Sequence, residues 1–173
     1  MKRNFILILF LAICAVACSP KPESETYDGK LLTIAYVGEK PAYESSKISY
    51  KEVPVEGIQS AAEDLSADFD ALFVMPGTFE KLSTDSYTPF FHGLSIPVAF
   101  VGSEKGHLPF ITEGVTYQTG FDLGNGSHST VYMNTGGAEK REDAWYFYLE
   151  DADGHPRSPD EVFSDMLRKI EEL

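Results

Sequence analysis

The run from Ala71 to Met75 is apolar throughout and is ended by Pro76 and Gly77. A strand that is apolar on both faces must be covered on both faces, which is typical of the centre of a parallel sheet. Two other runs have the same form, since residues 32–37 end at Gly38 and residues 97–101 end at Gly102. Three buried strands that each end in a glycine predict a parallel sheet whose loops leave one edge.

The neighbouring segments predict how this sheet is completed. Residues 47–53 alternate apolar and polar side chains, which favours a strand with one wet face near an edge. Apolar residues at helical spacing predict a helix in 57–67, and short helices are expected at 78–82 and 88–93. Short crossovers between buried strands favour a right-handed α/β unit. We therefore expect one α/β domain over residues 30–173, with a central, mostly parallel sheet and flanking helices.

The pattern changes after Gly106. Short strands are expected at 114–119, 129–134 and 144–149, as antiparallel additions to the sheet or as a small meander packed on it. A C-terminal amphipathic helix follows, with Ser158 and Glu161 forming a capping box and Pro159 in the first position. Its apolar face is expected to lie on the sheet; this face comprises Val162, Phe163, Met166, Leu167 and Ile170.

The charge of the chain limits its partners. The formal net charge is -13, which disfavours nucleic acid and anionic lipid headgroups. It is typical of an acidic surface kept for solubility; the alternative is a loose preference for cations or basic partners. Hydrophobic residues make up 43% of the chain, so a packed core is expected.

The N-terminus has the pattern of an export signal. Lys2 and Arg3 precede an apolar run over residues 5–17. This run is shorter than the ~20 residues that a spanning helix needs. A basic start, a short apolar centre and a small-residue exit are typical of a secretory signal peptide, here residues 1–17.

The exit, Ala15-Val16-Ala17-Cys18, resembles the lipobox of bacterial lipoprotein precursors. The resemblance implies cleavage before Cys18 and attachment of diacylglyceryl to its sulfur, with acyl chains such as palmitate. Leucine is usual where this chain has Ala15. Cys14 is a rival acceptor, but Ile13 is too bulky for the residue before the cut, and ordinary secretion with cleavage at Ala17 remains the alternative. The lipoprotein interpretation predicts a lipid anchor in the cell membrane and a domain on its extracytoplasmic face.

Two consequences follow for the mature chain. Cys14 and Cys18 are the only cysteines, so the domain is expected to have no disulfide, no cysteine nucleophile and no thiolate metal ligand. Residues 18–29 would be the lipidated cysteine and a flexible tether, because residues 19–28 are rich in Pro, Ser and Glu. Ten extended residues reach at most ~35 Å.

A candidate ligand site lies at the predicted strand ends. Ligands of open α/β sheets tend to bind beyond the carboxyl ends of the parallel strands. That edge would gather polar and glycine residues from three loops: Gly38, Glu39, Gly77, Thr78, Gly102, Ser103 and Glu104. The alternative is that these glycines only end strands, because glycine tolerates positive φ. No phosphate-loop pattern follows any strand, so a nucleotide is not expected.

The other chemical candidates are weak in the sequence. Asp151-x-Asp153-Gly154 is part of a calcium-loop pattern, but Leu149 stands where another oxygen ligand is needed, so a turn is expected. The four histidines have no ligand spacing, so no zinc site or other metal site is expected. Ser127 and His128 are adjacent, which favours a mobile turn over a nucleophile and base. The aromatic residues Tyr87, Phe90 and Phe91 are expected to pack in the core.

Two classes of function remain. The first is a non-catalytic domain that binds a partner protein or a small solute, without a cofactor. The second is a small hydrolase or metal-dependent enzyme with its site at the carboxyl ends of the strands. The enzyme class predicts a His–carboxylate pair within ~3.2 Å in a cleft, whereas the binding class predicts scattered, solvated groups.

Overall fold

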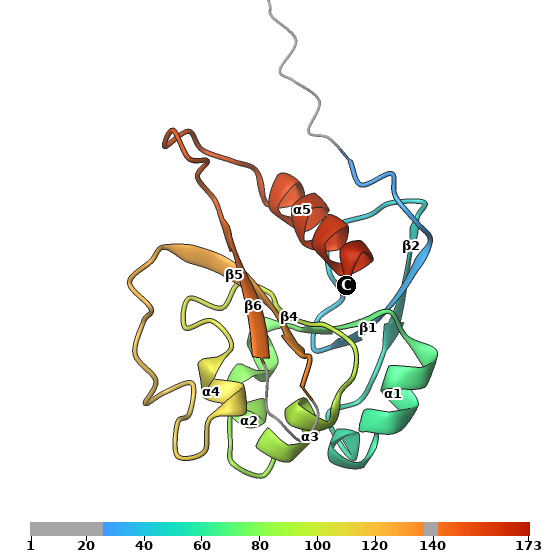
Figure 1. The fold of residues 1–173 in the computed structure, drawn as a ribbon, viewed down its shortest axis with the longest axis vertical. Helices are drawn as coiled ribbons and strands as arrows, with labels where there is room; N and C mark the ends of the chain where they lie inside the picture. Colours follow the sequence, from blue (N-terminus) through green and yellow to red (C-terminus); the bar gives the residue numbers. More distant parts are fainter. Residues whose placement is uncertain (1–25, 137–141) are drawn as a thin grey trace, which may run out of the picture.

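The computed structural model describes residues 26–136 and 142–173, and these form a mixed six-stranded sheet (Figure 1). The strand order is β2-β1-β3-β4-β5-β6. The first four strands are mutually parallel, and the last two are antiparallel additions. The expected α/β fold is confirmed. The strands are β1 (Leu32–Val37), β2 (Ile48–Glu52), β3 (Ala71–Val74), β4 (Val98–Phe100), β5 (Ser127–Asn134) and β6 (Glu142–Tyr148).

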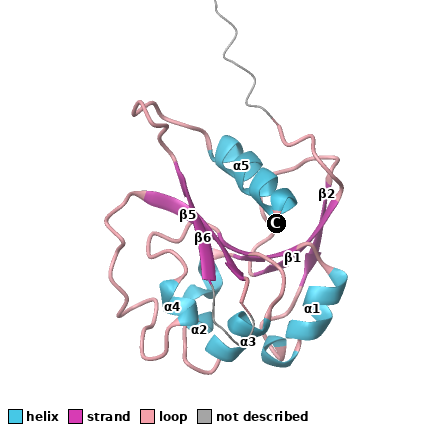
Figure 2. Cartoon of the chain, in the orientation of Figure 1, coloured by secondary structure: helices cyan, strands magenta, loops and turns pink. Residues whose placement is uncertain are grey.

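Helices cover both faces of the sheet (Figure 2). Four short helices contribute side chains to one apolar core, and the C-terminal helix α5 packs on the other face in a second core. Two 3₁₀ turns, η1 (Ile58–Ser60) and η2 (Pro76–Thr78), lie on the connections. The helices are α1 (Ala62–Asp68), α2 (Phe79–Leu82), α3 (Thr88–Gly93), α4 (Leu108–Ile111) and α5 (Pro159–Glu172).

The central strand is buried on both faces, as its sequence predicts. Leu72 and Val74 of β3 belong to the core under the short helices, whereas Ala71 and Phe73 belong to the core under α5. All four side chains are 0% exposed. Because successive side chains of a strand point to opposite faces, an uninterrupted apolar run can supply both cores at once.

Helix α5 forms as its sequence predicts. The Ser158 side chain accepts from the Glu161 backbone N–H, and the Glu161 carboxylate accepts from the Ser158 backbone N–H. This reciprocal capping satisfies two otherwise unpaired donors. All five residues of the predicted apolar face are buried, and the Phe163 ring stacks on Tyr43 with ring centroids 5.6 Å apart.

The predicted strand at 114–119 is wrong, because this segment forms turns. Thr116 and Thr119 each accept from the other's backbone N–H through their side-chain hydroxyls, at 3.0 and 3.2 Å. Short polar side chains that bind nearby backbone groups compete with a strand ladder. Gly114, with φ +78°, turns the chain just before them. The helix expected in 57–67 is also divided, into η1 and α1.

The folded part begins before residue 30. Tyr27, which composition assigns to the tether, is 1% exposed, and its hydroxyl donates to the Glu171 carboxylate at 2.8 Å. Its backbone N–H donates to the Tyr43 hydroxyl, also at 2.8 Å. The leader and Cys18 lie outside the described residues. Within residues 26–136 and 142–173, no helix combines the length and the apolar character needed to cross a membrane.

Candidate functional site

The predicted ligand edge is a set of turns packed against one another. Gly38 has φ +102°, and a Cβ there would lie 3.0 Å from Met75 Cβ and 3.1 Å from Thr78 Cγ2. Gly102 has φ +72°, and its Cβ would lie 3.4 Å from Pro76 Cγ. The turns after β1, β3 and β4 are therefore neighbours, and Gly38 is needed both for its backbone conformation and for the close approach.

The polar groups of this edge divide into two kinds. The Thr78 hydroxyl donates to the Met75 carbonyl and the Ser103 hydroxyl to the Gly106 carbonyl, both at 2.8 Å and both buried. Glu39, Gly77 and Glu104 are exposed. The two hydroxyls thus stabilise their own turns, and none of the pockets described below is lined by any of the seven predicted residues.

Strand β5 adds a histidine to this edge. The Gly102 backbone N–H donates to Ser129 Oγ at 3.0 Å, and Ser129 Oγ lies 2.9 Å from His128 Nδ1. Because Ser129 already accepts from Gly102, its own proton is free to donate to Nδ1. Burial lowers the pKa of His128, and the nearby charge of Glu104 opposes that shift. The predicted mobile turn at Ser127 and His128 is wrong, since both belong to β5.

A pocket of about 640 Å³ lies at the other end of the strands, away from the turns that follow β1, β3 and β4. Glu142 at the start of β6 pairs with Asn134 at the end of β5, and β5 runs antiparallel to β4. The pocket is thus beside the amino end of β4, among α3, α4 and the start of β6. Its lining combines apolar side chains with two carboxylates; the residues are Thr88, Pro89, His92, Leu108, Ile111, Thr112, Glu113 and Glu142.

His92 is fixed in this pocket by its neighbours. Its Nε2 lies 2.9 Å from the Ile111 carbonyl, which can only accept, so Nε2 carries a proton and donates. Its Nδ1 lies 3.4 Å from the Tyr132 hydroxyl and 3.5 Å from Glu142 Oε1. The Asn134 side-chain amide donates to the His92 carbonyl at 2.6 Å. Nδ1 is therefore the ring nitrogen that faces Tyr132 and Glu142.

This geometry does not match a proton-transfer pair. The 3.5 Å between His92 and Glu142 exceeds the ~3.2 Å limit for a direct hydrogen bond between acid and base. His155 approaches Asp151 at 3.2 Å, but its side chain is 75% exposed. Asp151, Asp153 and His155 bring their ligand atoms within 4.8 Å of one another, on an exposed turn. Asp151 Oδ1 accepts from the backbone N–H groups of the other two, so this cluster forms the predicted turn.

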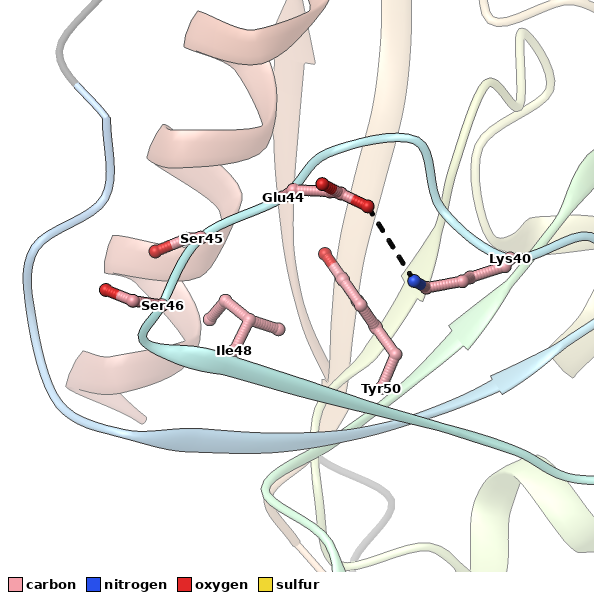
Figure 3. Close-up of a pocket in the computed structure, with 6 residues that line it drawn as sticks. All are labelled: Lys40, Glu44, Ser45, Ser46, Ile48 and Tyr50. Atoms are coloured by element: carbon pink, nitrogen blue, oxygen red, sulfur yellow. Dashed lines mark ion pairs between the residues drawn. The ribbon is translucent and has the colours of Figure 1, made fainter.

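A second pocket, of about 400 Å³, lies under the loop between β1 and β2 (Figure 3). Lys40 and Glu44, which line this pocket together with Tyr50, form an ion pair at 3.9 Å, and both are well exposed. Such a pair contributes ~0–1 kcal/mol. The Tyr50 hydroxyl is buried without a hydrogen-bond partner in the described chain, and burial raises its pKa. Ser45, Ser46 and Ile48 complete the lining.

A third pocket, of about 520 Å³, lies beside the end of β6 and is lined by Asn125, Gly126, Tyr148, Leu149, Glu150, Asp151 and Ala152.

Comparison with known proteins adds no relative: no family model, curated protein or solved structure matches this chain.

Proposed function

We propose that the protein is a bacterial lipoprotein, anchored through Cys18 at the extracytoplasmic face of the cell membrane, and that its domain binds a ligand without catalysis. The anchor is supported by the leader and by Ala15-Val16-Ala17-Cys18. The domain has its own two cores, whose first member is Tyr27. A stretch of only a few residues then separates the proposed lipid from the folded part, which keeps the domain close to the membrane.

The ligand site in this proposal is the pocket at His92, and its ligand is a small organic cation with an apolar body. One observation carries the assignment: Glu113 and Glu142 share a pocket with Leu108 and Ile111. A carboxylate beside apolar side chains favours a cationic ligand, because charge-assisted hydrogen bonds are stronger than hydrogen bonds between neutral groups. The apolar side chains of the lining would cover the body of the ligand.

His92 acts in this site by position. Its Nε2 is committed to the Ile111 carbonyl, so the ring is held between α4 and β6 and keeps Nδ1 toward Glu142. The ring thereby limits where the Glu142 carboxylate can turn. A ligand ammonium would bind the Glu142 carboxylate.

Binding of tryptamine tests this site, with its uncharged analogue tryptophol as the matched ligand. We expect calorimetric titration to give saturable binding of tryptamine and at least tenfold weaker binding of tryptophol. Glu142→Gln removes one charge-assisted contact and should weaken tryptamine about tenfold or more. Glu150→Gln, two residues beyond the end of β6 and outside the pocket at His92, is the matched control. Equal affinities for both ligands, or equal losses in both variants, would refute the assignment.

A second candidate function, a small hydrolase or metal-dependent enzyme at the strand-end edge, is favoured by the orientation of His128. Ser129 fixes its Nδ1, and the charge of Glu104 lies nearby. Ester or phosphoester hydrolysis that disappears in His128→Ala and persists in His155→Ala would replace binding as the function.

A further inference from the structure

Strand β6 is the last strand of the sheet on its side, and its outer edge is unpaired in the part of the chain that the structure describes. Its seven residues, Glu142–Tyr148, hydrogen-bond to β5 on one side, and no other backbone bond to a described residue involves them. The segment contains no Lys and no Pro, two residues that commonly protect edges. The opposite edge, β2, carries Lys51 and is followed by Pro54.

The side chains of β6 are unusual for an unpaired edge. Trp145, Tyr146, Phe147 and Tyr148 are all only partly buried. Trp145 and Phe147 pack beside the core under α5, and Tyr146 lies against His107 on the other face. An extended aromatic edge with free backbone donors and acceptors is a template for another strand.

We infer that the partner strand is β6 of a second copy of this chain, paired antiparallel about a two-fold axis normal to the sheet. A symmetric antiparallel pair is centred on one residue, and full overlap of a seven-residue strand centres it on Trp145. Glu142 then faces Tyr148 of the second copy, and Ala144 faces Tyr146 of the second copy. The two sheets join into one continuous sheet.

Charge favours this register over its neighbour. Centring on Trp145 places Asp143 opposite Phe147, so no carboxylate faces another carboxylate within the strand. Centring on Tyr146 would place Glu142 opposite Glu150 of the second copy. Like charges directly opposite are destabilising, so Glu142 and Glu150 disfavour centring on Tyr146. Full overlap of the seven residues distinguishes centring on Trp145 from centring on Ala144.

The position of the N-terminus favours a second copy as the partner. The described chain starts on the α5 side of the sheet, where Tyr27 and Lys30 both bind Glu171 (Figure 1). A two-fold axis normal to the sheet keeps α5 of both copies on the same face. Both tethers would then leave on one side and reach one membrane. This step rests on the proposed lipid anchor, which also raises the local concentration of copies.

Reversing one charge tests the register. In Tyr148→Glu a carboxylate faces Glu142 of the second copy at both ends of the pair, and in Tyr148→Lys an ammonium faces it. We expect sedimentation of the detergent-extracted protein to show a two-chain particle. The dimer dissociation constant of Tyr148→Glu should exceed that of Tyr148→Lys about tenfold or more. The two-fold axis makes each dimer contain two copies of the pair between residue 148 and Glu142. Ser49→Glu and Ser49→Lys, on the other edge strand, are matched controls that should not differ.

Disulfide trapping gives an independent readout in membranes. Directly opposite residues of antiparallel strands have Cα atoms ~4.5–5.5 Å apart, within reach of a disulfide. Trp145→Cys should therefore cross-link to itself on oxidation, whereas Phe147→Cys, ~13 Å from its equivalent, should not. The chain with Trp145 retained controls for Cys14 and Cys18.

Three outcomes would overturn the dimer: a single-chain particle at every concentration, equal dissociation constants for the two Tyr148 variants, or trapping of a different protein at Trp145→Cys in place of a second copy. Failure of the anchor is separable from all three. It would appear as unlipidated protein that still pairs through β6.

Discussion

His107 makes stability depend on pH in a way that one substitution can isolate. Its side chain is 6% exposed, stacks on the Tyr132 ring at 5.4 Å and leaves Nδ1 without a partner in the described chain. Burial lowers the pKa of His107 from 6.5 to about 4. Above pH 6.5 the ring is neutral in both the folded and the unfolded chain. Below it, the unfolded chain takes up a proton that the folded chain does not take up until about pH 4.

The free energy of unfolding therefore falls as the pH drops through this window. The folded pKa is about 2.5 below the unfolded one, which corresponds to about 3 kcal/mol in full. By pH 5 the loss from this residue alone is about 2 kcal/mol. His107→Phe keeps a ring against Tyr132 and removes the titrating group, so the variant should lack this part of the pH dependence.

Urea unfolding at pH 7.5, 6.5, 5.5 and 5.0 measures the effect. The carboxylates also titrate at the low end, so the quantity of interest is the difference in unfolding free energy between the natural protein and His107→Phe. That difference should shift by about 2 kcal/mol in favour of the variant between pH 7.5 and pH 5.0. His155→Phe, at an exposed histidine, is the matched control and should follow the natural protein. Parallel curves for the natural protein and His107→Phe would refute the reasoning.

Two further predictions concern α5. Phe163→Ala removes a buried ring that stacks on Tyr43 and packs on Phe73. It should lower the free energy of unfolding, measured by urea titration, by ~3–5 kcal/mol. A loss below ~1 kcal/mol would mean that the packing of α5 on the sheet contributes little to stability. Ser158→Ala removes the hydroxyl that caps the Glu161 backbone N–H and should lower the free energy of unfolding by ~0.5–2 kcal/mol in the same assay. Ser158→Gly should be closer in stability to the natural protein. A glycine variant less stable than the alanine variant would contradict the capping geometry.

The parts of the fold that follow from local sequence were predictable. The uninterrupted apolar run in β3 required cover on both faces, and the capping box with its apolar face defined α5. Segment 114–119 was not predictable from alternation, because Thr116 and Thr119 bind the backbone that a strand would have used. Tyr27 lies in a stretch whose composition is that of a tether, yet its contacts with Tyr43 and Glu171 come from segments distant in the sequence.

The candidate sites divide in the same way. The glycine turns at Gly38 and Gly102 follow directly from the ends of apolar runs, so their place at one sheet edge could be expected. The pocket at His92 could not, because it depends on where the β5–β6 hairpin places Glu142 relative to α3. His92 and Glu142 have no characteristic spacing in the sequence, and their proximity is a product of strand register.

The most direct test of the account is the intact mass of the protein isolated from the membranes of a bacterial host. We expect a mature chain that begins at Cys18 and carries a diacylglyceryl group on its sulfur, and we expect Cys18→Ala to move the protein out of the membrane fraction. A chain that retains residues 1–17, or one that begins at or after residue 18 without lipid, would contradict it.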